Sequence, residues 1–157
     1  MVKVRKSIRK FLALHLHHID SSIIIEPEKT IDGKICRKYL QKIGYNYRGK
    51  FSSPVLSELF MRLLSIESYE DRDSFLRIID HLVKKRKVDY YTPIRIGKLS
   101  EDIKEIDSRL EPHDIQIVAC AIEDDAKNLI TLDQKLIHNQ SIEERYNLRI
   151  SHPKEFI

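Results

Sequence analysis

Strand-like runs alternate with segments of helical periodicity along the chain, and this alternation is the strongest constraint on its fold. The strand-like runs span residues 14–19, 47–52, 88–94, 128–131 and 148–151. Helical patterns span residues 4–14, 29–43, 54–64, 72–86, 100–110 and 114–126. Short strands separated by helices are typical of a parallel sheet whose two faces are both covered. The sequence therefore predicts an α/β fold with a short, mostly parallel central sheet flanked by helices on both faces.

The composition is that of an ordinary globular domain. A chain of 157 residues with 41% hydrophobic content is long enough to bury one core without disulfides or metal. Cys36 and Cys120 lie far apart and in no metal-ligand spacing, so we expect buried free thiols and a reducing compartment. The sequence has no apolar run of roughly 18 residues and no signal-peptide pattern. We expect a cytoplasmic protein that does not associate with membranes.

Positive charge is concentrated in two segments. The net charge is +4, but residues 1–13 carry five cations and no acid, which leaves +4 − 5 = −1 for the remainder. A second block ends the helix predicted at 72–86. Such blocks can bind phosphate groups, although cations also stabilise the C-terminal end of a helix, and that explanation is favoured for the second block alone. The two segments comprise Lys3, Arg5, Lys6, Arg9 and Lys10, and Lys84, Lys85, Arg86 and Lys87.

Two acids each follow a predicted strand directly. Asp20 ends the segment LHLHHID, and Asp133 ends NLITLD. In open α/β sheets, ligands bind in the crevice at the carboxyl ends of the strands, which is where both acids should lie. Either aspartate alone is better explained as a turn or capping residue. Two such acids, one after each strand, are less easily explained by turn or capping roles.

Two further acids stand in the first turns of predicted helices. Glu58 follows a Ser-Pro start signal, and Asp114 opens the apolar segment DIQIVACA. The helix dipole favours an acid at such a position without any further role, and this explanation is strong for Glu58. It is weaker for Asp114, because its neighbours three, four and seven residues later are all apolar. Asp114 should therefore project along a face that is buried.

Four segments in order resemble the acidic motifs of PIN-domain ribonucleases. They are IDSSIII at 19–25, SPVLSELF at 53–60, HDIQIVACA at 113–121 and LITLDQKL at 129–136. The ending SHPKEFI is similar to the closing segment of VapC-type toxins in that family. The resemblance covers residues 14–157, which we treat as a PIN-like nuclease domain. Residues 1–13 form a basic helical extension that most such chains lack.

The resemblance implies that Asp20, Glu58, Asp114 and Asp133 form one acidic pocket, with Thr131 and Ser21 at its edge. Carboxylate oxygens suit hard cations, so the implied cofactor is Mg²⁺ or Mn²⁺. Such an ion lowers the pKa of bound water and generates an attacking hydroxide. The expected function is metal-dependent endoribonuclease hydrolysis of RNA phosphodiester bonds, as the toxin of a VapBC-type toxin–antitoxin pair. The implied partners are RNA, bound by the two basic segments, an antitoxin protein and a second copy of the chain in a homodimer.

Other interpretations remain open at this point. The chain could be an RNA-processing nuclease without an antitoxin, or a catalytically silent PIN-fold RNA-binding module. A receiver-type signalling domain is disfavoured because it usually pairs two acids after its first strand, and no such pair is present here. His15, His17 and His18 could offer imidazoles to a transition metal, but packing is the favoured role.

Two smaller sequence features also bear on the expected pocket. His18 shares a strand face with Asp20 and is expected to border the pocket, and His113 adjoins Asp114. Tyr45 and Tyr47 could stack on bases, although packing at the edge of the sheet is favoured for both.

Overall fold

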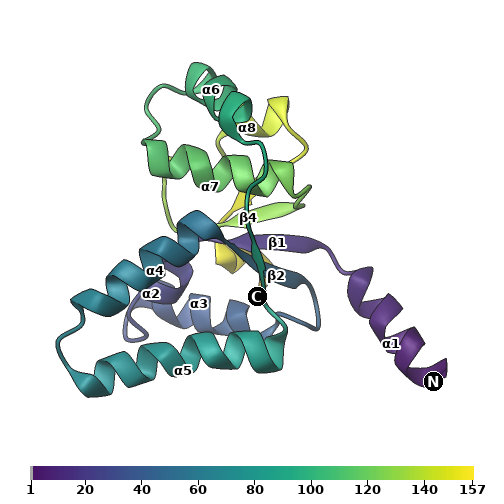
Figure 1. Cartoon of the computed structure of the whole chain (residues 1–157), viewed down its shortest axis with the longest axis vertical. Helices are drawn as coiled ribbons and strands as arrows, with labels where there is room; N and C mark the ends of the chain where they lie inside the picture. Colours follow the sequence, from purple (N-terminus) through teal and green to yellow (C-terminus); the bar gives the residue numbers. More distant parts are fainter. Residues whose placement is uncertain (1) are drawn as a thin grey trace.

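Five parallel strands form the centre of the protein in the computed structural model, which describes residues 2–157, with side chains from Lys3 onward (Figure 1). The strand order is β3-β2-β1-β4-β5, and each neighbouring pair is parallel. The expected α/β class is confirmed, and the sheet is wholly rather than mostly parallel. The strands are β1 (Leu16–Ile19), β2 (Arg48–Ser52), β3 (Asp89–Tyr91), β4 (Asn128–Ile130) and β5 (Arg149–Ser151).

The helices divide between the two faces of the sheet. Crossovers between parallel strands are almost always right-handed, so connections that run in opposite directions along the sheet place their helices on opposite faces. Figure 1 shows α2, α3 and α5 on one side of the sheet and α6, α7 and α8 on the other. The first group comprises α2 (Ser22–Ile25), α3 (Ile31–Gln41), α4 (Ser53–Ser65) and α5 (Tyr69–Arg86). The second comprises α6 (Gly97–Ile106), α7 (Pro112–Glu123) and α8 (Gln140–Arg145).

The N-terminal helix α1 (Val2–Leu12) projects away from the rest of the molecule (Figure 1). It ends two residues before the limit that the sequence pattern predicts. Val4, Ile8 and Leu12 are 62%, 52% and 56% exposed, so the apolar stripe of this helix is not packed against the remainder of the chain. The division at residue 13 stays a prediction.

Three short helical elements were not predicted from the sequence. These are α2, directly after β1, the helix α8, and the closing 3₁₀ helix η1 (Pro153–Phe156), which packs against α3. None is long enough to show a helical period. The helix expected at 100–110 is also displaced, since α6 begins at Gly97 and ends at Ile106.

An aromatic cluster buries His17 beneath the sheet. Its ring stacks on Tyr47 with centroids 4.3 Å apart and meets the edge of Phe156 at 4.7 Å. Its Nδ1 lies 2.9 Å from the Tyr39 hydroxyl, and its Nε2 lies 3.2 Å from the Asn128 side-chain amide. The packing role is therefore confirmed for His17, and Tyr47 is buried and unavailable to bases.

The remaining composition-based expectations concern the cysteines and the membrane. Cys36 and Cys120 are both buried and free, as expected. Within residues 2–157 no helix combines the length and the apolarity that crossing a membrane requires.

Gly33 provides a first test of the packing of α3. A Cβ at this position would lie 1.9 Å from the carbonyl oxygen of Pro27. Gly→Ala inside a helix ordinarily stabilises a protein by up to about 1 kcal/mol, but overpacking costs roughly 1–3 kcal/mol. We therefore expect Gly33→Ala to lower the free energy of unfolding in urea by about 1–3 kcal/mol. Gly97→Ala is the control, because beyond its chain neighbours and its own helix backbone no atom lies within 4 Å of its Cβ position. A gain of stability in both variants would contradict the close approach of α3 to Pro27.

His17 should make the protein less stable in mild acid. Burial is the main cause that lowers its pKa from 6.5 to about 3, so below pH 6.5 the unfolded chain binds a proton that the folded chain does not. The free energy of unfolding is therefore highest above pH 6.5 and decreases toward pH 3, by about 1.4 kcal/mol per pH unit. Between pH 7.5 and 5.0 the wild type should lose about 2 kcal/mol more than His17→Phe in urea unfolding. Equal losses would show that His17 is protonated in the folded protein.

Candidate active site

Asp20 lies where the strand order of the sheet reverses. It follows β1, whose neighbour β4 belongs to the other half of the chain, and its backbone N–H donates to the carbonyl of Ile130 at 2.9 Å. The gap between the carboxyl ends of two such strands is where α/β sheets bind ligands. The sheet thus places Asp20 at the expected site of chemistry.

Three donors hold the Asp20 carboxylate. Oδ1 accepts from the Ser21 backbone N–H at 2.9 Å, while Oδ2 accepts from the hydroxyls of Ser22 and Thr131, each at 2.7 Å. The turn into α2 supplies the two serines. Burial raises the pKa of Asp20 and outweighs these hydrogen bonds, which act in the opposite direction, while the nearby charge of Glu58 raises it further. The side chain is therefore fixed in place, but its charge is disfavoured.

Glu58 reaches the same place from α4. This helix begins directly after β2, and its second residue, Pro54, suits the first turn of a helix. Oε2 of Glu58 accepts a hydrogen bond from the Ser21 hydroxyl and lies 2.9 Å from Nε2 of His113. Ser21 thus links Asp20 to Glu58 through its backbone N–H and its hydroxyl.

Asp114 enters from the first turn of α7. Its Oδ2 accepts from the Glu111 backbone N–H at 3.3 Å, as part of a capping box, and lies 3.7 Å from Nζ of Lys135. The side chain is 17% exposed, in agreement with the expectation that it projects along a largely buried face. Asp114 therefore caps its helix and also faces the pocket.

Asp133 lies in the loop after β4. Its Oδ1 accepts from the Lys135 backbone N–H at 2.9 Å, which is the turn role considered for an isolated aspartate. Its own N–H donates to the Thr131 hydroxyl at 3.0 Å, and the Leu132 N–H donates to the Ser22 hydroxyl at 3.1 Å. The bond from Leu132 to Ser22 joins the loop after β4 to the end of β1.

The four acids line one open pocket of about 390 Å³. In the part of the chain that the structure describes, however, no three Asp, Glu, His or Cys side chains lie close enough to hold one metal ion. Each acid has protein partners instead. The full lining comprises Asp20, Ser21, Ser22, Ile25, Glu26, Glu58, His113, Asp114, Ile117, Leu132 and Asp133. The acids are thus neighbours, and their role as a ligand set stays a prediction.

The donor chemistry of the pocket fits the implied cofactor. The lining offers mainly carboxylate and hydroxyl oxygens, with the His113 imidazole and no thiol, a composition that suits Mg²⁺ or Mn²⁺ better than softer metals. Glu26 adds a fifth carboxylate that the sequence motifs did not indicate.

Two basic side chains contact acids of the pocket, and only one of them, His113, was placed near it from the sequence. Lys135 faces Asp114, and His113 faces Glu58. The position of Lys135 two residues after Asp133 was the only signal, and it also fits an ordinary surface lysine.

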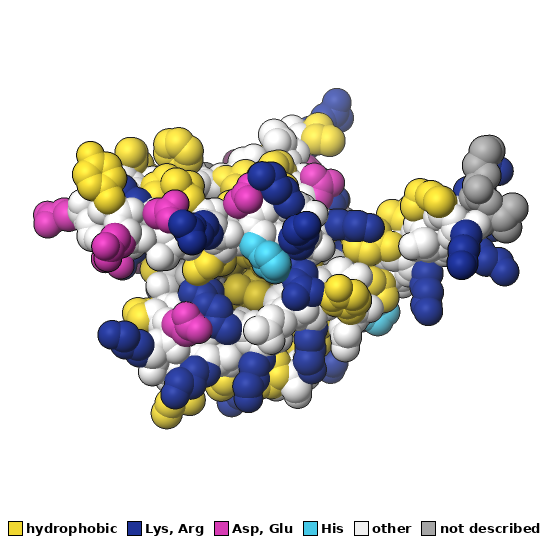
Figure 2. Space-filling model, turned by 90° about the horizontal axis from the view of Figure 1, so that it is seen from below, with side chains coloured by type: hydrophobic (Ala, Val, Ile, Leu, Met, Phe, Trp, Pro, Cys, Tyr) yellow, Lys and Arg dark blue, Asp and Glu magenta, His cyan; other side chains and the backbone are white. Residues whose placement is uncertain are grey.

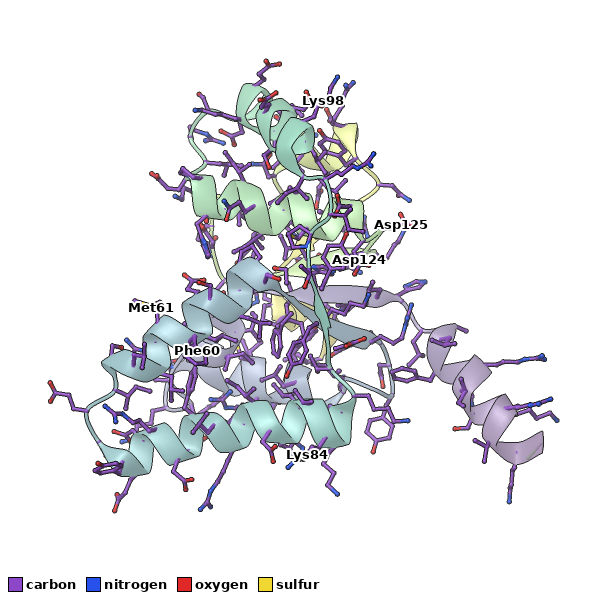
Figure 3. All side chains as sticks on the ribbon, viewed as in Figure 1. Phe60, Met61, Lys84, Lys98, Asp124 and Asp125 are labelled. Atoms are coloured by element: carbon purple, nitrogen blue, oxygen red, sulfur yellow. The ribbon has the colours of Figure 1, made fainter. Side chains whose placement is uncertain are left out.

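The expectation that His18 borders the pocket is wrong. Its Nε2 lies 2.7 Å from Oδ2 of Asp124, which also accepts from Nζ of Lys50 at 3.0 Å. Asp124 follows α7 and reaches the sheet at the amino-terminal side of β4 (Figure 3). This partner lies 106 residues away in sequence, so no local pattern could have revealed it.

The basic segments lie at the other edge of the sheet. The helix α1 precedes β1, and α5 ends just before β3, so both reach the amino ends of the strands. The acids follow the carboxyl ends. The structure therefore does not bring the predicted RNA-binding cations beside the pocket.

No protein-family model and no curated protein matches the chain. Its fold is nevertheless that of the VapC-type PIN domains in toxin–antitoxin complexes, which confirms the PIN-like fold that the motifs implied.

Three solved structures illustrate the likeness. A chain of VapBC2 from Rickettsia felis aligns with a TM-score of 0.63 and 20% identity, over 87% of this chain and 98% of that chain. A chain of VapBC-1 from nontypeable Haemophilus influenzae aligns with a TM-score of 0.61 and 23% identity. A chain of VapBC-5 from Mycobacterium tuberculosis aligns with a TM-score of 0.61 and 13% identity. Each alignment covers 88% of this chain and 98% of the other chain. At these identities the likeness establishes the fold.

Asp20→Asn tests whether the site is strained without metal. Because burial raises the pKa of Asp20, removal of its charge should leave the free energy of unfolding in EDTA at pH 7 equal or higher. A capping aspartate would instead lose about 1 kcal/mol. Asp107→Asn is the matched control, since Arg109 holds the pKa of Asp107 well below its usual range and its loss should destabilise the fold. Urea unfolding of both variants separates the alternatives.

Proposed function

We propose that the protein is a metal-dependent endoribonuclease that hydrolyses RNA phosphodiester bonds. The observation that carries the proposal is the pocket between β1 and β4, where acids from four separate segments line one opening. A general nuclease role is also supported by the likeness to VapC-type folds.

Asp20, Glu58 and Asp114 would hold Mg²⁺ or Mn²⁺, with Asp133 as a ligand through water or as the residue that orients the attacking water. When bound, such an ion lowers the pKa of water and stabilises charge on the phosphate.

The remaining residues orient and balance this set. Ser22 and Thr131 fix one oxygen of Asp20, and the Ser21 backbone N–H fixes the other, so the carboxylate cannot rotate away from the pocket. Nζ of Lys135 lies 3.7 Å from Oδ2 of Asp114, and Nε2 of His113 lies 2.9 Å from Oε2 of Glu58. Both can contact phosphate oxygens of a bound RNA while its reacting bond lies over the acids.

The proposed partners are an antitoxin and a second copy of the chain. The similar structures are VapBC complexes, and that assembly is extended here to this chain as a proposal. Phe60, Met61 and Leu64 on α4 are 65%, 65% and 64% exposed, and Figure 3 shows Phe60 and Met61 on this helix. The same helix carries Glu58. A partner that covers this apolar surface would therefore lie beside the pocket.

A catalytically silent RNA-binding module is the second candidate function. This candidate is favoured because each of the four acids has its own protein partners. No three of the described metal-ligating side chains lie close together. A nuclease of RNA processing would keep the same pocket without an antitoxin. A gene for a small antitoxin next to this one would distinguish these two nuclease roles.

Cleavage of labelled RNA in Mn²⁺ tests the proposed activity. Asp20→Asn should reduce the rate at least about 100-fold, because it removes charge from the metal site while it preserves shape. Asp125→Asn is the control, since Asp125 is exposed and Asn tolerates its positive φ of 54°. Calorimetry should show Mn²⁺ binding to the wild type and weaker binding to Asp20→Asn. A wild type that neither binds Mn²⁺ nor cleaves RNA would support the silent module.

A further inference from the structure

A basic groove lies at the amino-terminal edge of the sheet, opposite the acidic pocket. We call it the amino-edge groove. It has a volume of about 420 Å³, and its walls come from α1, from the turn after α3 and from the end of α5. The lining includes Lys10, Phe11 and Leu14 from the first segment, Tyr45 from the second, and Lys85 and Lys87 from the third.

The three lysines of the groove are unpaired. No acidic residue lines the groove, and within residues 3–157 none of Lys10, Lys85 or Lys87 forms an ion pair. The adjacent Lys84 differs, because its Nζ lies 2.9 Å from Asp80. Figure 2 shows Lys and Arg side chains spread over this face, including the side from which α1 projects. The groove therefore presents positive charge that is free to meet an anion.

Aromatic rings stand beside these cations. The guanidinium of Arg86 lies 5.2 Å from the ring centroid of Tyr45, and Nζ of Lys87 lies 5.1 Å from that of Phe11. Tyr45 is 72% exposed. Cations next to accessible aromatic faces are the arrangement by which proteins bind single strands, since the cations meet phosphates and the rings stack on bases.

The position of Tyr45 is built into the fold. Gly44 has a φ of 88°, and a Cβ there would lie 3.0 Å from the Arg86 carbonyl oxygen. The turn after α3 therefore packs directly against the end of α5, and it holds Tyr45 over Arg86. Backbone packing therefore fixes this wall of the groove.

We propose that the amino-edge groove binds a single-stranded segment of RNA at a distance from the acidic pocket. The choice of RNA rests on the proposed function. Only unpaired bases can stack on Tyr45, so a duplex would not use the aromatic part of the groove.

The spacing of the two sites sets a minimum length for RNA. Six residue-to-residue steps separate Leu14 in the groove from Asp20 in the pocket, which corresponds to about 20 Å at roughly 3.3 Å per residue. At about 3.4 Å per nucleotide of a stacked strand, about six stacked nucleotides span this distance. A shorter stacked RNA can occupy only one of the two sites, so the groove cannot help it to reach the pocket.

Binding of a fluorescent 12-nucleotide uridine RNA in EDTA tests the groove without cleavage. Lys10→Gln/Lys87→Gln should weaken binding and reduce the slope of log affinity against log salt by up to about 1.4, or roughly 0.7 per lost contact. Lys98→Gln/Lys104→Gln on α6 removes the same charge, and Figure 3 shows Lys98 at the opposite end of the molecule from Lys84. That control should keep the wild-type slope.

Tyr45→Ala tests the aromatic part. It should weaken binding at least about fivefold with the salt slope unchanged, because a stacking contact releases no counterion, and Tyr45→Phe should restore the affinity.

Two results would overturn the proposal. The first is an RNA affinity and a salt slope that stay unchanged in both Lys10→Gln/Lys87→Gln and Tyr45→Ala. An equal loss of affinity and slope in the Lys98→Gln/Lys104→Gln control would count the same way. The second is displacement of the RNA by a poly-glutamate peptide at equal charge concentration with no effect of Tyr45→Ala, which would assign the groove to an acidic protein segment. Failure of the proposed nuclease is distinguishable, because RNA held in the groove but not cleaved in Mn²⁺ refutes only the activity.

Discussion

The reversal of strand order between β1 and β4 is the constraint on which the rest of the structure depends. Right-handed crossovers place α3 and α5 on one face and α6 and α7 on the other, and the two halves of the chain diverge from the β1–β4 pair. No crossover covers the carboxyl ends of these two strands. A polar opening is therefore a consequence of topology, and the Asp20 N–H bond to Ile130 fixes the two halves relative to each other at this point.

The opening is stabilised by hydroxyl groups that serve two strands at once. Ser22 donates to Asp20 and accepts from the Leu132 N–H, while Thr131 donates to Asp20 and accepts from the Asp133 N–H. A buried carboxylate without donors would be very costly, so these bonds lower the penalty of placing Asp20 here. They do not remove it, since burial still raises the pKa of Asp20. The fold alone therefore disfavours the charged form of Asp20.

Much of this arrangement could be predicted from local sequence, because strand ends and helix starts are local features. Asp20 and Asp133 were placed by the strands before them, and Asp114 by the apolar helix that it opens; all three line the pocket. Contacts between distant segments could not be predicted. Nothing near His18 indicates its bond to Asp124, and Lys135 looks like any surface lysine until β1 and β4 are paired. Four-residue elements such as α2 carry no period to detect.

The separation of acids and cations to opposite edges has a physical reason. Lysines placed beside the pocket would pair with its carboxylates, as Lys135 approaches Asp114 at 3.7 Å, and each such pair would reduce the charge that both groups offer to a ligand. Across the length of β1 the two groups are about 20 Å apart, more than twice the screening length of about 8 Å at physiological salt. The amino-edge groove can therefore attract a polyanion without neutralising the pocket. An RNA chain is flexible enough to span both, so the affinity and the chemistry can be tuned by different residues.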